Sequence, residues 1–379
     1  MAEHSTESFS LKDQLFNSER VNYLADLFAS TDSGFDKANF VRQSIDQLTK
    51  LELKQRVVHL ASVLENFLSD DFRVATRQIT SALPPPLDPS KTDNDFGDFI
   101  FAPLGEYVVR NGLEKRHVKL SLRTLKQLTM RFSMEDAIRS FINEHTEDTM
   151  AELAKWATDS NYHVRRLASE GTRPRLPWSG RLVIPCTSAI PLLDTLHADP
   201  TRYVTRSVAN HLNDIAKTDP LVVIETLTRW KDLAVQNSPE LHWMTKHALR
   251  TLIKKGDSKA LEVLGFRSNP KIEISQFRLK RSTLKFGEAL EFSFNVTAKR
   301  DEPVLIDYVI DFMKANGTTS PKVFKLKQLD LKKSSTVTIK KKHVLKANAT
   351  TYKLYPGEHG LTLQLNGRAM DQATFNLRK

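Results

Sequence analysis

Residues 161–178 read Asn-Tyr-His-Val-Arg-Arg-Leu-Ala-Ser-Glu-Gly-Thr-Arg-Pro-Arg-Leu-Pro-Trp. The composition up to Glu170 favours a helix, and Gly171 followed by Pro174 predicts where that helix ends. Arg166 and Glu170 stand four residues apart, so they share one helix face. The segment therefore predicts a helix that runs into a basic, proline-stiffened turn ending on an aromatic ring. A surface salt bridge followed by an ordinary loop is the alternative interpretation.

An aromatic residue followed three residues later by a basic residue recurs at intervals of 41 and 40 residues. The three pairs are Tyr162 with Arg165, Tyr203 with Arg206, and Trp243 with Lys246. This period is typical of HEAT-type helix pairs, which bury their apolar faces only by stacking on neighbouring pairs. The sequence therefore predicts an all-α, HEAT-like helical-repeat solenoid.

Each repeat also carries a row of polar residues at helical spacing. The rows are Tyr162, Arg166, Ser169 and Arg173; Tyr203, Ser207, Asn210 and Asp214; and Trp243, His247, Arg250 and Lys254. Stacked, the rows predict one polar, aromatic and basic surface, called the polar wall below, which suits a phosphodiester chain. A solvated face without a ligand is the alternative, and it explains the basic residues better than the aromatic residue that starts each row.

After Pro270 the hydrophobic period changes from that of a helix to that of a strand. Leu290, Phe292, Phe294 and Val296 alternate with polar residues. Roughly seven short strands in about 110 residues are typical of an immunoglobulin-like sandwich. We therefore expect a multidomain chain, with a HEAT-like domain over residues 1–266 followed by an all-β immunoglobulin-like sandwich over residues 267–379.

The net charge of +11 suggests a polyanionic partner, and its distribution is uneven. Residues 270–379 hold 21 Lys and Arg against 10 Asp and Glu, which leaves 56−21=35 basic and 45−10=35 acidic residues for the rest of the chain. The whole excess of positive charge is therefore in the C-terminal part. Lysines that only keep the sheet edges soluble and unpaired are the alternative interpretation.

Several classes of protein are excluded by the sequence. The single cysteine, Cys186, excludes a disulfide framework and a cysteine-rich zinc site. No apolar run approaches the length of a membrane span, and the N-terminus lacks the features of a signal peptide. No dinucleotide-binding, Walker or zinc-protease motif is present. We expect a cytoplasmic monomer without metal or cofactor, whose chemistry depends on carboxylates set among arginines and aromatic rings.

Three segments carry a family resemblance. Residues 163–178, the run Ser-Val-Ala-Asn-His-Leu-Asn-Asp at 207–214, and the run Thr-Lys-His-Ala-Leu-Arg-Thr-Leu-Ile-Lys-Lys-Gly at 245–256 closely resemble the AlkC branch of the HEAT-repeat alkylpurine DNA glycosylases. The resemblance covers most of residues 1–266. It implies base excision repair by hydrolysis of the N-glycosidic bond of cationic bases in double-stranded DNA, such as 3-methyladenine and 3-methylcytosine. It also implies that the lesion is not drawn into a deep pocket, unlike in most base-flipping enzymes.

The resemblance also implies roles for particular residues. Glu170 and Asp214 are the candidate catalytic carboxylates, which would stabilise an oxocarbenium-like sugar and place a water. Trp178 is the third candidate, through contact of its ring with the sugar or the cationic base. Candidates for DNA binding in the helical domain are Arg166, Arg173, Arg175, Tyr203, Asn210, Trp243, His247, Arg250 and Lys254. From the charge distribution, and not from the resemblance, we add Lys340, Lys341 and Lys342 of the sandwich, which we expect to clamp the duplex from the side opposite the polar wall.

Structural roles remain open for these residues. Glu170 as a plain partner of Arg166, Asp214 as an acid on a helix surface, and Trp243 as a core residue are the alternatives. The competing function is a non-catalytic HEAT scaffold that binds DNA or protein, because HEAT folds host many binding functions.

Overall fold

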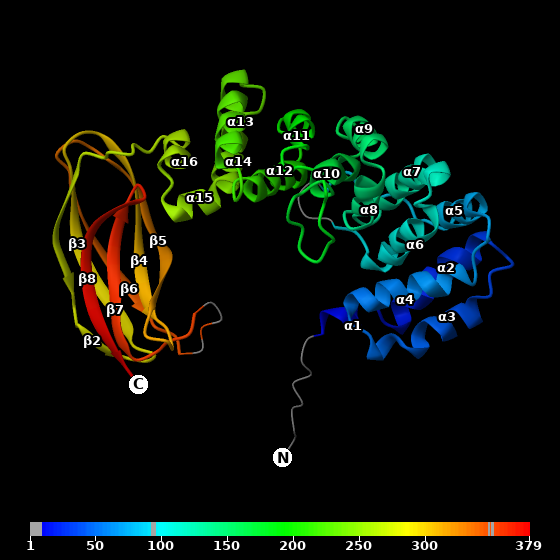
Figure 1. The fold of residues 1–379 in the computed structure, drawn as a ribbon, viewed down its shortest axis with the longest axis horizontal. Helices are drawn as coiled ribbons and strands as arrows, with labels where there is room; N and C mark the ends of the chain where they lie inside the picture. The colour runs from blue at the N-terminus through cyan, green and yellow to red at the C-terminus, as the bar shows by residue number, and fades with distance from the viewer. Residues whose placement is uncertain (1–9, 92–95, 348, 350–351) are drawn as a thin grey trace, which may run out of the picture. The chain divides into compact units, whose positions relative to one another are not determined.

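The computed structural model describes residues 10–91, 96–347, 349 and 352–379 (Figure 1). Residues 1–9, where we expect no signal peptide, lie outside the described residues, as do residues 92–95. The chain divides into two compact units. The first comprises Met1–Ile215 with Ala234–Met244, and the second comprises Ala216–Leu233 with Thr245–Lys379.

The first unit is helical. Its helices are α1 (Leu11–Leu15), α2 (Ser18–Thr31), α3 (Lys37–Asp46), α4 (Leu53–Glu65), α5 (Phe72–Ser81), α6 (Ala102–Gly112), α7 (Val118–Thr129), α8 (Ala137–Glu144), α9 (Thr146–Trp156), α10 (Tyr162–Glu170), α11 (Ile190–Leu196) and α12 (Arg202–Ile215), with short 3-10 turns at Leu48–Lys50, Phe99–Phe101 and Lys115–His117. Most of α14 (Ser238–Ala248) also belongs here. The helix expected over 162–170 is confirmed, and the Asn161 side chain caps its first turn.

Helices α10 and α12 pack against each other, and their polar rows meet between them. Ser207 Oγ donates a hydrogen bond of 2.9 Å to Ser169 Oγ, and the rings of Tyr162 and Tyr203 meet edge to face at 5.9 Å. All four side chains are buried. The two rows are therefore partly buried between the helices, whereas Arg173 and Asn210 of the same rows are partly exposed, because a helix in the middle of a stack has neighbours on more than one face. The open polar wall stays a prediction.

The second unit contains the β-sandwich and helices α13 (Pro220–Leu233), α15 (Arg250–Lys255) and α16 (Ser258–Val263). The strands are β1 (Ile272–Leu279), β2 (Thr283–Lys285), β3 (Ala289–Ala298), β4 (Glu302–Met313), β5 (Thr319–Leu331), β6 (Thr336–Val344), β7 (Gly357–Leu365) and β8 (Arg368–Arg378). One sheet has the order β1-β3-β6, and the other has the order β2-β8-β7-β4-β5. All described pairs are antiparallel except β2 with β8.

The core of the sandwich follows the alternation seen in the sequence. Leu290, Phe292, Phe294 and Val296 of β3 are buried, as the alternation predicts. They pack in one cluster with inward residues of β4 and β7. The helical part followed by an immunoglobulin-like β part is thus confirmed, whereas the domain boundary after residue 266 stays a prediction.

The turn between β7 and β8 packs against the end of α15 within the second unit. A Cβ atom added to Gly256, which has φ +75°, would lie 2.7 Å from the carbonyl oxygen of Gly367. Both glycines therefore permit a close approach of two backbone segments. The Asn366 side chain also donates a hydrogen bond of 3.0 Å to the carbonyl of Arg267.

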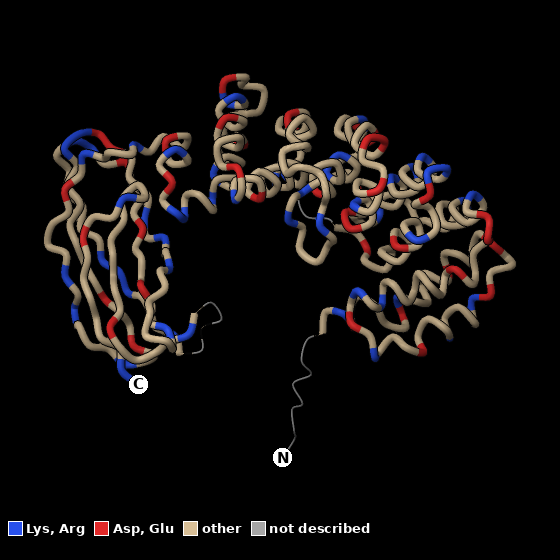
Figure 2. The backbone as a smooth tube through the Cα atoms, viewed as in Figure 1, with Lys and Arg blue, Asp and Glu red and all other residues tan. Residues whose placement is uncertain are grey.

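Basic residues occur along the strands and turns of both sheets of the sandwich (Figure 2). None of the helices in the described part of the chain is both long and apolar enough to cross a membrane.

Candidate functional site

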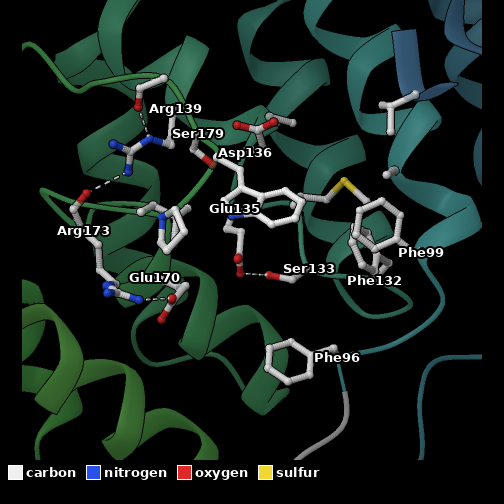
Figure 3. Close-up of a pocket in the computed structure, with 18 of the residues that line it drawn as sticks. Phe96, Phe99, Phe132, Ser133, Glu135, Asp136, Arg139, Glu170, Arg173 and Ser179 are labelled. Carbon is white, nitrogen blue, oxygen red and sulfur yellow. Dashed lines mark hydrogen bonds and ion pairs between the residues drawn. The ribbon is translucent and has the colours of Figure 1, made fainter. Parts of the chain in front are cut away.

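A cavity of about 920 Å³ lies within the first unit (Figure 3). Its lining comes from α1, α4, α6, α8, α10 and α12 and from the loops that precede α6 and α8 and follow α10. The lining includes Glu170, Trp178 and Arg173, which the sequence singled out, together with Glu135, which it did not. Residues from distant parts of the sequence therefore meet in one place.

Glu170 ends α10 and is only 5% exposed. Arg173 Nη1 donates to its Oε1 at 2.5 Å, and Ser207 Oγ donates to its Oε2 at 2.5 Å. Arg166 Nη2 lies 3.6 Å from Oε2. Burial by itself would raise the pKa of the Glu170 carboxyl, but the charges of the two arginines and these hydrogen bonds hold that pKa below its ordinary value. Glu170 is therefore ionised at neutral pH, and its ion pairs are buried rather than on the surface.

Asp214 of α12 contacts the same arginine. Arg173 Nε and Nη2 donate to Asp214 Oδ2 at 3.0 and 2.8 Å. One guanidinium thus joins the two carboxylates that the sequence proposed. Asp214 is buried, which excludes the alternative of an acid on a helix surface. Among the described residues, Glu170 and Arg173 line the cavity and Asp214 does not, so Asp214 is linked to the cavity lining through its ion pair with Arg173.

Glu135, just before α8, is a third carboxylate of the site that the sequence interpretation missed. Its side chain is 26% exposed, and it accepts hydrogen bonds from Arg166 Nη1 at 2.9 Å and from Ser133 Oγ at 2.7 Å (Figure 3). The sequence around it looks like an ordinary helix start, where acidic residues are common. Its partner Arg166 is 31 residues away, so no local spacing reveals the pair.

These five groups form what we call the carboxylate–arginine network: Glu135, Glu170, Asp214, Arg166 and Arg173. Three negative and two positive charges give 2−3=−1 for the network. It is largely shielded from water, so its field is stronger than that of the same charges on a surface. The network by itself therefore contributes net negative charge beside the cavity.

Arg166 and Tyr203 occupy positions different from those expected. The guanidinium carbon of Arg166 lies 4.5 Å from the centroid of the Tyr203 ring and 5.3 Å from that of Phe96. Arg166 and Tyr203 are both buried, whereas Phe96 is half-exposed at the cavity. Both residues line the cavity, and their contact with DNA stays a prediction. A phosphate at Arg166 would have to displace the carboxylates that this side chain already binds.

Trp178 lies in the loop after α10 and is 68% exposed where it lines the cavity. Its φ of +73° is unusual for a residue with a side chain, and such strain tends to occur at functional sites. Arg175 of the same loop is also exposed. The structure thus leaves the Trp178 ring available to a ligand.

The remaining candidates of the helical domain are placed as follows. Asn210 lines the cavity. Trp243 is half-buried, and the Arg202 guanidinium carbon lies 3.9 Å from the centroid of its ring. His247, Arg250 and Lys254 belong to the second unit, where Arg250 Nη1 donates to the His247 carbonyl and Lys254 is exposed. None of these last four lines the described cavity.

The three lysines of β6 do not share one face. Lys340 and Lys342 are exposed opposite Ser293 and Glu291 of β3, at the edge of the three-stranded sheet. Lys341 is half-buried, and its Nζ lies 6.0 Å from the centroid of the Tyr308 ring. The reason is that successive residues of a strand point to opposite faces of the sheet. Lys340 and Lys342 are therefore the pair that faces outward.

His211 of α12 lies beside the network and was not expected there. It is fully buried, and its Nδ1 lies 3.0 Å from the carbonyl oxygen of Ser169. Burial lowers the pKa of His211 to about 4, so the ring is neutral at neutral pH. In the described residues we find no group of three or more His, Cys, Asp or Glu that is arranged to hold a metal ion.

Comparison with known proteins gives the following similarities. Residues 273–379 match the family model described as "Uncharacterised protein YhaZ, C-terminal Ig-like domain". The chain is 33% identical over 369 residues to YhaZ of Bacillus subtilis (strain 168), which covers 96% of this chain and 98% of that protein. It also superposes, with a TM-score of 0.83 and 32% identity, on the Pseudomonas fluorescens alkylpurine DNA glycosylase AlkC bound to DNA containing an abasic site analog. That superposition covers 98% of this chain and 100% of the other.

Proposed function

The chain belongs to the AlkC family of alkylpurine DNA glycosylases, and on this premise we propose that it excises cationic alkylated bases from double-stranded DNA in base excision repair. The substrates we propose are 3-methyladenine and 3-methylcytosine, attacked without deep base flipping by a HEAT-like repeat domain. The likeness to AlkC along nearly the whole chain supports the glycosylase class. The main observation in support of the proposed reaction is that Glu170 is buried, ionised and part of the cavity lining.

The chemistry we propose needs little more than charge and a placed water. A base alkylated at N3 is already cationic, so it leaves readily when the glycosidic bond breaks. The sugar then develops oxocarbenium character, which the net charge of −1 of the carboxylate–arginine network stabilises. Neither the breaking of this bond nor the addition of water requires a metal or another cofactor.

The three carboxylates differ in their access to water, which suggests a division of roles. Glu170 and Asp214 are buried and act through their charge. Glu135 keeps about a quarter of its side chain exposed, so in our proposal it orients the attacking water. Trp178 would place its ring against the sugar or the cationic base.

The direct test is incubation of the full chain with a duplex that carries 3-methyladenine, followed by alkaline cleavage at abasic sites. We expect strand cleavage with the wild-type chain and a strong loss with Glu170→Gln. Asp148→Asn is the matched control, because Asp148 pairs with Lys115 on the surface, away from the cavity. A non-catalytic scaffold, the competing function, produces no abasic sites with any variant.

For the sandwich we propose a role as a basic clamp on the duplex. The support is that its residues carry the entire excess of positive charge, and that Lys340 and Lys342 face outward from an edge strand.

A further inference from the structure

Arg139 of α8 is a buried arginine that the carboxylate–arginine network does not use. It is only 3% exposed. Its Nη1 donates to the carbonyl of Arg173 at 2.8 Å (Figure 3) and to that of Gly171 at 3.1 Å. Its Nε donates to the carbonyl of Gly180 at 2.7 Å. All three acceptors belong to one loop, residues 171–180.

This loop carries two groups of the proposed site, and few interactions within the loop stabilise its conformation. Arg173 and Trp178 both lie in it. At its start, Gly171 N donates to the Leu167 carbonyl of α10 at 2.9 Å. Beyond Gly171, the described backbone hydrogen bonds of this kind are Arg173 N to Glu170 O at 3.3 Å and Ser179 N to Leu176 O at 3.4 Å, and both are long. Trp178 has a positive φ and is mostly exposed, so packing contributes little to holding it in place.

Arg139 joins the two ends of this loop. Its Nη1 holds the start, and its Nε holds the end beyond Trp178. Asn143, one turn later on the same face of α8, continues the contact. Its side chain donates to the Arg181 carbonyl at 2.9 Å and accepts from Val183 N at 3.0 Å. Helix α8 is therefore the support on which the loop rests.

The chemistry of Arg139 also indicates a specific role. Its hydrogen-bond acceptors among the described residues are these three carbonyls, with no carboxylate hydrogen-bonded to it. A buried charge of this kind is an inefficient way to gain stability, since an apolar side chain would fill the same space without losing hydration. A planar guanidinium can, however, hold three carbonyls in one fixed arrangement.

We propose that Arg139 is a positioning residue for base excision: it fixes the conformation of the 171–180 loop and so holds the Trp178 ring at the cavity. The proposal rests on the glycosylase function proposed above. It assigns Arg139 no contact with the substrate.

The first test uses the full chain with Arg139→Met and Arg139→Lys, neither of which can bond all three carbonyls. Limited trypsin digestion, read by mass spectrometry, should cut faster after Arg175 and Arg181, which are exposed in and beside the loop. Single-turnover excision should fall by at least about tenfold while DNA affinity stays within about threefold, since positioning acts on the chemical step. The control is Arg56→Met, because Arg56 is also buried and bonds the carbonyls of Lys12, Phe16 and Leu51, in addition to its ion pair with Asp13. That variant should leave digestion of the loop unchanged.

The second test asks whether Arg139 acts through Trp178. In a Trp178→Ala background, Arg139→Met should lower the excision rate by less than about threefold further, because the group that it positions is already gone. Fully additive losses would overturn the proposal, as would wild-type digestion of the loop in a folded variant. If Arg139→Met does not fold, Arg139→Lys is tested in its place, with the same measurements of loop digestion and single-turnover excision. Absence of excision by the wild-type chain would instead refute the proposed function, while the digestion would still test the loop.

Discussion

Replacing Glu170 by glutamine tests the network with the smallest change of shape. The amide keeps the size of the side chain, and its single oxygen can still accept the hydrogen bond from Arg173 while its NH2 group faces Ser207 Oγ, but the change removes one negative charge. Asp214 still pairs with Arg173, and Glu135 still pairs with Arg166. The charge of the network therefore changes from −1 to zero with its partners in place.

The expected magnitude follows from Coulomb's law. With an effective dielectric constant of about 20, a unit charge about 4 to 8 Å from the reacting sugar contributes roughly 2 to 4 kcal/mol. The arginines that remain nearby offset part of this, so we expect the excision rate to fall by at least about tenfold, which corresponds to about 1.4 kcal/mol. The weakened hydrogen bonds should also lower the free energy of unfolding by about 1 to 3 kcal/mol.

Single-turnover excision with enzyme in excess measures the chemical step, and fluorescence anisotropy on an undamaged duplex measures binding. We expect the first to fall and the second to change by less than about threefold, because Glu170 is buried and the substitution leaves the exposed basic residues unchanged. The Asp148→Asn control should match the wild type in both. An unchanged single-turnover rate for Glu170→Gln would refute the argument from the charge of the network.

Three further outcomes are expected. Trp178→Ala should reduce excision with little change in melting temperature, because the ring is mostly exposed; a large drop in melting temperature would mark it as structural. The pKa of His211 is lowered to about 4 from 6.5, so its contribution to stability is complete above about pH 6.5 and is lost as the pH falls toward about 4. Measured by urea unfolding, the free energy of unfolding should fall by about 3 kcal/mol between about pH 6.5 and about pH 4 because of this residue. That fall should be absent in His211→Asn. Replacing both Lys340 and Lys342 by alanine should reduce the slope of log affinity against log salt by up to about two, and an unchanged slope would remove them from the DNA contact.

Local patterns in the sequence determined much of the fold. Alternation over 290–296 predicted a strand with a buried face, and β3 has it, because successive side chains of a strand must point to opposite sides. The C-terminal ends of α10 at Gly171 and of α15 at Gly256 likewise follow from the residues next to them in the sequence. The long segments that resemble the AlkC family also carried the family assignment, without any knowledge of contacts.

The sequence also supplied part of the site, since Glu170, Asp214 and Trp178 all stand where they can contribute to it. Spacing on single helices, however, did not show which residues of the polar rows are buried. Stacking buries Tyr162, Ser169 and Ser207 at the contact of α10 and α12, whereas Arg173 and Asn210 stay partly exposed at the cavity.

Only the tertiary structure decided how the charges are paired. Arg173 joins Glu170 to Asp214, Arg166 turns inward to Glu135, and Arg139 fastens a loop that starts 32 residues further along the chain. None of these pairings except that of Arg173 with Glu170 lies within one helical turn. They depend on the angles and distances at which helices stack, which are set by packing across the whole unit, so the periodicity of any one segment does not encode them.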